Sequence, residues 1–358
     1  MRLTLLRQVM AERKLDGMLI TQPENRRYLS GFSGSAGVLI VSVERQAIAT
    51  DFRYYEQVLG QCHGWELCRV GYDFDGKMLD TLRSLGLAGH TVGFEASHVS
   101  VDRLLSWERA LNGHVRLMDT SGIVEGMRVS KDESELATIQ RAAALADEAL
   151  AYIYDYIQPG MTERHVAWEL ERIMRTQGAS GVAFEVIVAS GPNGALPHLR
   201  PTERVIQAGE PIVLDLGCVV DGYCSDITRT VCLGEPQDSR YLQLWHLVLR
   251  AQEKALIGIR AGITSKEGDK LARDVIVEAG FGECFGHGLG HGVGLAVHED
   301  PLLSFARSGQ VPAGAVVTVE PGIYIPGWGG VRIEDMLLVR EVGGKTLTSA
   351  AKVAVLGR

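Results

Sequence analysis

The stretch PIVLDLGCVVDGYCSDITRTV, residues 211–231, decides the fold. Its first half reads as an apolar strand that is interrupted by a single carboxylate, Asp215. Asp221-Gly222 is a strong signal for a two-residue hairpin turn, and a turn there places Asp215 opposite Thr228. Asp226 lies two residues from Thr228, so it shares the face of Asp215. A buried carboxylate without a partner is unstable, so the hairpin predicts a polar partner for both aspartates.

The sequence around this hairpin is duplicated. A helical pattern over residues 136–157 runs into IQPGMTERHVAWELERI, and a second over residues 242–259 runs into IRAGITSKEGDKLARDV. Both patterns have the apolar spacing of an amphipathic helix. Strand-rich sequence follows each pair of helices. We therefore expect two related halves, each built from two helices and then strands.

Residues 1–128 have a different organisation. Short helical and strand-like pieces alternate there, with a hairpin that turns near Glu44. Ser130 and Glu133 form a capping box, which predicts the start of a new helix. We therefore place the domain boundary there. The predicted fold is an α/β N-terminal domain over residues 1–128 and an α+β domain over residues 129–358 with an internal pseudo-two-fold duplication.

The second half of the duplication repeats the carboxylates. Glu320 ends the apolar run AVVTVE, and Glu334 lies in VRIEDMLLV. If residues 326–330 form the hairpin loop, Glu320 faces Met336 and the two glutamates share a face, although one added loop residue would reverse this. Packing the two hairpins by their pseudo-symmetry brings four carboxylates together. Two divalent cations about 3.5–4 Å apart would neutralise such a cluster.

Three histidines fall in FGHGLGHGVGLAVHED, residues 285–300. We expect a glycine-rich loop there that leads into a strand, VGLAVHE. One imidazole added to the oxygen ligands suits Mn or Co, and Zn is possible. A fourth histidine, His198, lies in a loop rich in Pro and Gly, and by itself it is consistent with a surface residue.

Composition and motifs exclude several classes of protein. The 358 residues carry a net charge of −8 and no Lys/Arg run, which argues against a nucleic-acid partner. No apolar run reaches about 18 residues, so no membrane association is expected. Six cysteines without a CxxC pair are typical of small core residues in a reducing compartment, and we expect a cytoplasmic protein. HExxH, GxSxG, Walker A and GxGxxG motifs are absent.

Four segments resemble a known family: LDLGCVVDGYCSDITRT, FGHGLGHGVGLAVHE, TVEPGIY and GGVRIED. They are similar to the proline-specific metallopeptidases of the methionine aminopeptidase superfamily, which has the "pita-bread" fold. Residues 1–128, with NRRYLSGFSGSAG and ATDFRYYEQ, resemble the creatinase-type N-terminal domain. The resemblance implies an exopeptidase that uses two divalent metal ions, manganese above all, to hydrolyse the Xaa-Pro bond. It also implies a peptide substrate with proline at the second position, and a homodimer.

The same resemblance implies five metal ligands. Asp215 would bind one metal, and His291 and Glu320 would bind the other. Asp226 and Glu334 would bridge both. All five positions hold the residue type that the family motif requires.

Further residues receive roles by the same resemblance. Glu320 would also accept a proton from the attacking water. His198 and His298 would hydrogen-bond the scissile group and the tetrahedral intermediate. His287 would line the pocket for the proline ring, and Arg332 would orient the acidic cluster or the substrate.

Substrate length is less clear from the sequence. In prolidases, which take dipeptides, an arginine often follows the HE pair and binds the free carboxylate, but this chain has Leu302 there. Arg307 or Arg53 are possible substitutes. Without such an arginine, longer peptides should be cleaved at least as well, so we expect an Xaa-Pro aminopeptidase, with a prolidase as the alternative.

Two other classes remain as alternatives. One is a catalytically inactive pita-bread binding protein, and the other is a creatinase-like C–N hydrolase that needs no metal. Retention of all five ligands argues against both.

Overall fold

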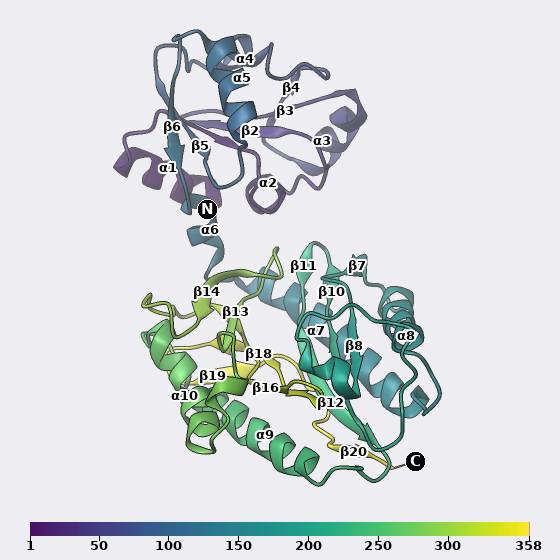
Figure 1. The fold of residues 1–358 in the computed structure, drawn as a ribbon. Helices are drawn as coiled ribbons and strands as arrows, with labels where there is room; N and C mark the ends of the chain where they lie inside the picture. Colours follow the sequence, from purple (N-terminus) through teal and green to yellow (C-terminus); the bar gives the residue numbers. More distant parts are fainter. Residues whose placement is uncertain (358) are drawn as a thin grey trace. The chain divides into compact units, whose positions relative to one another are not determined.

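The computed structural model describes residues 1–357. The chain folds into two compact units, Met1–Arg128 and a second that begins at Val129. The first unit contains a six-stranded sheet in the order β4-β3-β2-β1-β5-β6 (Figure 1). Its strands are β1 (Gly17–Ile20), β2 (Val38–Ser42), β3 (Gln46–Thr50), β4 (Glu66–Arg69), β5 (Thr91–Glu95) and β6 (Arg116–Thr120). Its helices are α1 (Arg2–Glu12), α2 (Pro23–Ser30), α3 (Tyr55–Gln61), α4 (Met78–Ser84), α5 (Val101–Leu111) and α6 (Ile123–Arg128). The expected hairpin near Glu44 is present as β2 and β3.

Four helices frame the second unit in two pairs. They are α7 (Glu133–Tyr156), α8 (Glu163–Thr176), α9 (Arg240–Gly258) and α10 (Ser265–Glu278). The capping box that starts α7 differs from the predicted one. It is formed by Asp132 and Glu135, since each side chain accepts a hydrogen bond from the backbone N–H of the other at 2.9 Å. Ser130 instead donates to Ala313 O, and the observed N-cap, Asp132, lies two residues after the predicted one.

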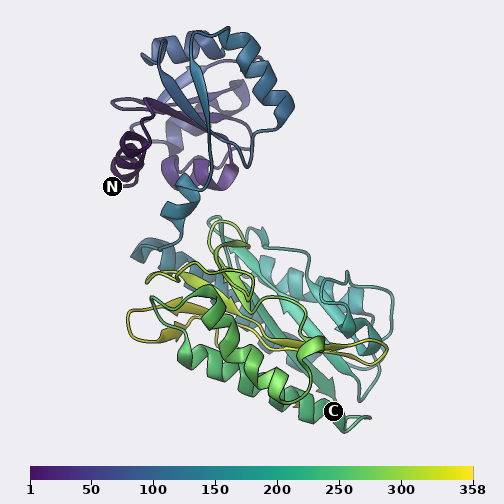
Figure 2. The same ribbon diagram turned by 60° about the vertical axis from the view of Figure 1, so that its left-hand side comes forward.

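Strands from both halves lie between the two helix pairs (Figures 1 and 2). The first half contributes β7 (Gly181–Val182), β8 (Ile187–Ser190), β9 (Pro211–Leu216), β10 (Cys218–Val220), β11 (Tyr223–Cys224) and β12 (Ile227–Leu233). The second half contributes β13 (Gly290–Gly292), β14 (Glu299–Leu303), β15 (Val316–Val319), β16 (Gly322–Ile325), β17 (Gly329–Arg332), β18 (Asp335–Val339) and β19 (Gly344–Thr346). The last strand, β20 (Val355–Leu356), pairs with β12. One apolar core lies under α7 and α8 and a second under α9 and α10, so each half buries its own helix faces.

The first hairpin has the predicted register. Val220 pairs with Tyr223, and Asp215 pairs with Thr228. Asp221 and Gly222 have φ values of 45° and 78°, which is the left-handed conformation that a two-residue hairpin turn of this type requires. The local turn chemistry therefore fixes which residues lie opposite each other along β9 and β12.

The second hairpin differs from the prediction by two positions. Ile325 pairs with Gly329, so the loop is only Pro326–Trp328, and Thr318 rather than Glu320 lies opposite Met336. Because the shift is even, Glu320 and Glu334 still share a face. The Trp328 indole donates to Asp238 at 3.1 Å, a contact that local sequence does not encode and that holds the short turn.

The glycine-rich segment also differs from the prediction. Its strands are β13, which contains His291, and β14, which begins at Glu299, so the stretch between them is not the expected strand. A Cβ at Gly290 would lie 2.1 Å from Thr318 O, which shows that β13 and its neighbour approach too closely for any side chain. No helix in the described residues is long and apolar enough to cross a membrane.

Candidate functional site

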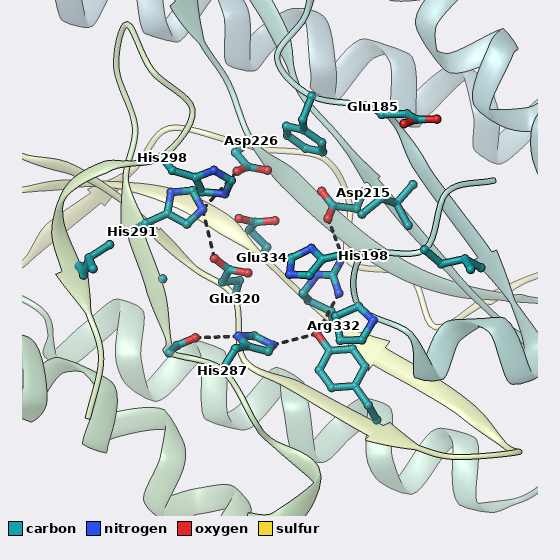
Figure 3. Close-up of a pocket in the computed structure, with 18 of the residues that line it drawn as sticks. Glu185, His198, Asp215, Asp226, His287, His291, His298, Glu320, Arg332 and Glu334 are labelled. Atoms are coloured by element: carbon teal, nitrogen blue, oxygen red, sulfur yellow. Dashed lines mark hydrogen bonds and ion pairs between the residues drawn. The ribbon is translucent and has the colours of Figure 1, made fainter. Parts of the chain in front are cut away.

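Four acidic side chains from separate elements point into one cavity of about 610 Å³ (Figure 3). Asp215 comes from β9, Asp226 precedes β12, Glu320 follows β15, and Glu334 lies between β17 and β18. Asp215, Asp226 and Glu334 are at most 8% exposed. The two hairpins therefore bring together the four carboxylates that the sequence predicted to meet.

One imidazole joins this cluster. His291 Nε2 lies 3.6 Å from Asp226 Oδ2 and 3.4 Å from Glu320 Oε1. Its Nδ1 lies 3.1 Å from the Gly292 carbonyl, a geometry in which Nδ1–H donates and Nε2 keeps its lone pair. One potential ligand atom each from Asp226, His291 and Glu334 lie within 4.8 Å of one another. The orientation of the ring suits a metal ligand.

The pKa values of three of the carboxylates are raised, first by burial and then by neighbouring charges. Burial is the largest cause for Asp226, Glu334 and Glu320, and the neighbouring carboxylates raise the pKa of Asp226 and Glu334 further. Neighbouring Asp215 also raises the pKa of Glu320, while His287 and Arg332 act in the opposite direction there. Such a site favours protons or cations over bare charges.

Arg332 holds Asp215 from one side only. Its Nη2 donates to Asp215 Oδ2 at 2.5 Å, its Nε to Thr228 Oγ1 at 3.1 Å, and its Nη1 to the Tyr324 hydroxyl at 2.8 Å. The other oxygen, Asp215 Oδ1, is buried and has no hydrogen-bond partner in the described structure. A buried carboxylate oxygen without a donor fits a metal ligand, because a cation is the partner it lacks.

His287 is fixed by two neighbours. Its Nδ1 lies 2.7 Å from Gly288 O, and its Nε2 lies 2.9 Å from the Tyr324 hydroxyl. Since that hydroxyl accepts from Arg332, it has its own proton to donate to Nε2. Burial lowers the pKa of His287, which agrees with a neutral ring. His287 therefore presents a ring face to the cavity, rather than a free nitrogen.

Two other histidines line the cavity with more exposed rings. His298 packs against His291 with ring centroids 4.2 Å apart, and burial lowers its pKa. His198 comes from the loop after η2 (Gly191–Ala195). The structure thus places every predicted site residue around one cavity: His198, Asp215, Asp226, His287, His291, His298, Glu320, Arg332 and Glu334.

Several site residues were missed from the sequence. Thr228 Oγ1 donates to Glu334 Oε2 at 2.6 Å, and Thr318 Oγ1 donates to Glu320 Oε1 at 3.0 Å. Strand alternation was the available signal for both, because each lies at a position facing the carboxylates. Tyr324 had no signal beyond its place in the quoted motif. Exposed Arg200 and Glu185 line the cavity from loops without periodicity.

Arg307, one of the two arginines proposed as substitutes for the prolidase arginine, does not line this cavity. Arg307 is exposed, whereas Leu302 does line the cavity. Arg53 belongs to the first unit, where it forms an ion pair with Asp51 at 2.8 Å.

Comparison with known proteins agrees with this site. Residues 137–341 match the model of metallopeptidase family M24, and residues 2–130 match the creatinase/prolidase N-terminal domain. The chain is 35% identical to an Xaa-Pro dipeptidase of Pyrococcus horikoshii, covering 96% of each chain. The structure resembles an Xaa-Pro dipeptidase from Bacillus anthracis (TM-score 0.95, 41% identity, 99% of each chain). It also resembles an X-Pro aminopeptidase from Thermotoga maritima (TM-score 0.88, 38% identity, 96% of this chain and 99% of that one). The chain therefore belongs to metallopeptidase family M24 and carries a creatinase/prolidase N-terminal domain ahead of its catalytic unit.

Proposed function

We propose that this enzyme is an exopeptidase that uses two divalent metal ions to hydrolyse the Xaa-Pro bond and release the N-terminal residue. The observation that carries the proposal is the convergence of four carboxylates and the Nε2 atom of His291 in one cavity. The names of the relatives support the choice of an Xaa-Pro substrate.

Five residues would hold the ions, as the family resemblance implies: Asp215 on one, His291 and Glu320 on the other, and Asp226 and Glu334 on both. The unpaired Oδ1 of Asp215 and the raised pKa values of the clustered acids fit this assignment. An oxygen-rich set with one imidazole favours manganese or cobalt, with zinc possible.

When bound, divalent ions lower the pKa of a coordinated water toward neutrality. Glu320 is suited to accept the proton of that water, because burial raises its pKa above the ordinary value of a glutamate and so makes it a stronger base. Thr318 holds this carboxylate in place by donating to Oε1. Arg332 fixes the orientation of Asp215 through Oδ2.

Histidines around the cavity would serve the substrate. His298 and His198 are exposed to the cavity and can donate N–H groups to the carbonyl oxygen as negative charge develops on it. His287, held by Tyr324 and Gly288, would form one wall for the proline ring. In the Xaa-Pro bond the nitrogen belongs to the proline ring and has no N–H, so a site for this bond also needs a group that protonates that nitrogen as the bond breaks.

The test is a panel of Ala-Pro, Ala-Pro-Ala and Ala-Ala-Ala with metal-free enzyme and with added Mn, Co or Zn. We expect metal-dependent cleavage of the two proline peptides only, together with two bound ions per chain by elemental analysis. Full activity without metal would favour a creatinase-like reaction, and no activity with metal bound would favour a binding protein.

A dipeptidase is the second candidate, since one observation favours it: Arg200, a cation, lines the cavity. The sequence favoured an aminopeptidase that accepts longer peptides, because Leu302 stands where prolidases often have an arginine for the substrate carboxylate.

Other features of the proposal have separate support. The division into two compact units and the ranges of the two family matches support a domain boundary after residue 128. The six cysteines are present as thiols in the described structure, which is compatible with the cytoplasm. The homodimer rests on the family resemblance, and sedimentation analysis tests it.

A further inference from the structure

The arginines and histidines that line the cavity differ in their availability to a substrate. Of the histidines, His287 is already engaged by Gly288 and Tyr324, and His291 faces Asp226 and Glu320 of the acidic cluster. Within the second unit, the arginines that line the cavity are Arg200 and Arg332. These two residues therefore carry its permanent positive charge.

The Arg332 guanidinium already donates hydrogen bonds to other residues of the protein. It is 3% exposed, and Asp215, Tyr324 and Thr228 receive hydrogen bonds from its three nitrogens. Binding a substrate carboxylate would require breaking contacts inside the acidic cluster. Arg332 is therefore not free for this purpose.

Arg200, in contrast to Arg332, is exposed to solvent. Its side chain is 84% exposed and forms an ion pair with Glu185 at 2.9 Å, and Glu185 is itself 58% exposed and lines the same cavity. An exposed ion pair of this kind contributes little free energy, because water screens both charges. A carboxylate that enters the cavity can replace Glu185 on the guanidinium at small cost, and a bidentate contact would favour the exchange.

The backbone around Arg200 is held at both sides. Leu199 packs against the apolar cluster of Ile187, Ala189 and Val213. Thr202 donates its N–H and its hydroxyl to the buried carboxylate of Glu163, at 3.1 and 2.6 Å. The guanidinium therefore extends from a fixed point beside His198, rather than from a free loop.

We propose that Arg200 binds the C-terminal carboxylate of an Xaa-Pro dipeptide in place of Glu185, and so makes dipeptides the preferred substrates. This inference rests on the proposed function. It gives the substrate carboxylate a partner on the loop of His198, although Leu302 leaves the family position after the HE pair uncharged.

The test compares two substrates that differ only in that charge, Ala-Pro and Ala-prolinamide, with Ala-Pro-Ala as a third. In the manganese-loaded enzyme, Arg200→Gln should lower kcat/KM for Ala-Pro by about 10- to 100-fold, and change it for Ala-prolinamide by about twofold at most. The ratio of kcat/KM for Ala-Pro-Ala over Ala-Pro should lie well below one in the wild type and rise toward one in the variant.

Two further variants sharpen the test. Arg307→Gln removes an exposed arginine that does not line the cavity, and it should leave all three values unchanged. Glu185→Gln removes the competing carboxylate and should lower KM for Ala-Pro by about two- to fivefold. Calorimetry adds a readout without turnover: Arg200→Gln should weaken binding of L-proline but not of L-prolinamide.

The possible failures are distinguishable. If the wild type cleaves no Xaa-Pro substrate, the proposed function and this inference are both overturned. If it cleaves them but Arg200→Gln lowers Ala-Pro and Ala-prolinamide equally, or neither, the role of Arg200 alone is overturned.

Discussion

Glu163 offers a sharp test of how the loop of His198 is held. This residue lies in the first turn of α8 and is fully buried. It accepts hydrogen bonds from the N–H of Ser190 at 2.8 Å and of Thr202 at 3.1 Å, and from Asn193 Nδ2 at 3.0 Å. The hydroxyls of Ser190 and Thr202 also donate hydrogen bonds to the Glu163 carboxylate. One carboxylate thus ties both ends of the segment that carries His198.

The cost of removing it follows from those contacts. Glu163→Ala leaves two backbone N–H groups without an acceptor, at about 1–3 kcal/mol each. The sum of about 2–6 kcal/mol corresponds to a fall in Tm of at least about 4 °C in a unit of this size. Glu163→Gln keeps one acceptor oxygen and should cost about half as much. Loosening of the loop by about 1 Å lowers kcat/KM by up to about 100-fold.

The assay measures kcat/KM for Ala-Pro and the number of bound metal ions at a temperature well below Tm. The Tm of each variant is measured separately. We expect Glu163→Ala to lower kcat/KM for Ala-Pro while two metal ions remain bound, because no proposed ligand lies on this loop. Glu169→Gln is the matched control: it lies on the same helix but pairs with Arg172, and it should leave kcat/KM unchanged. A lower Tm with normal kcat/KM would refute the idea that this carboxylate positions the loop.

Three other predictions concern the metal site. Asp226→Asn or Glu334→Gln should abolish activity if each carboxylate bridges both ions, and near-normal turnover with metal bound would contradict the bridging assignment. His291→Ala should lose at least one ion per chain by elemental analysis, whereas His298→Ala should keep both and lose rate; equal metal loss in the two would contradict that division of roles. Because the pKa values of Asp226, Glu320 and Glu334 are raised, the metal-free site retains protons that metal binding must displace, so metal affinity should rise with pH. His291 has a lowered pKa and adds no proton to this count near pH 7. Calorimetry in buffers of different ionisation enthalpy measures how many protons are released when metal binds. A metal affinity that does not change with pH would contradict this prediction.

The sequence predicted the register of the first hairpin correctly but not that of the second, for a physical reason. Asp221-Gly222 is a turn whose backbone angles are set locally, so the register followed from two residues. In the second hairpin, several glycines and a proline allow more than one loop length. The choice depends on the contact between Trp328 and Asp238, which are far apart in the chain. The shared face of Glu320 and Glu334 was predicted correctly because the observed loop is shorter than the expected one by an even number of residues.

The family motif indicated the residues that would hold metal and one residue that orients them, Arg332, but not the other residues that hydrogen-bond the carboxylates. Thr228, Thr318 and Tyr324 act through hydrogen bonds between strands, and such contacts need the actual register. Arg200 lies on an exposed loop where no periodicity operates. Its place beside the cavity depends on the anchoring of that loop to Glu163 by tertiary contacts.

The duplication explains why equivalent positions in the two halves hold the rim of one cavity. In the first half, the side chain at the first residue of α8, Glu163, accepts from the backbone of the segment that carries His198. In the second half, the first residue of α10 is Ser265, whose buried hydroxyl accepts from the N–H of Ser304, next to Leu303 and Leu302. The first residues of α8 and α10 therefore each hold a different segment of the cavity lining, one through a carboxylate and the other through a hydroxyl. The Glu163 carboxylate accepts from several donors along the segment that carries His198, whereas the Ser265 hydroxyl accepts from the N–H of Ser304. Substrate selection can then differ between these two segments without disturbing the acidic cluster, because the cluster residues lie on or beside the strands rather than on either segment.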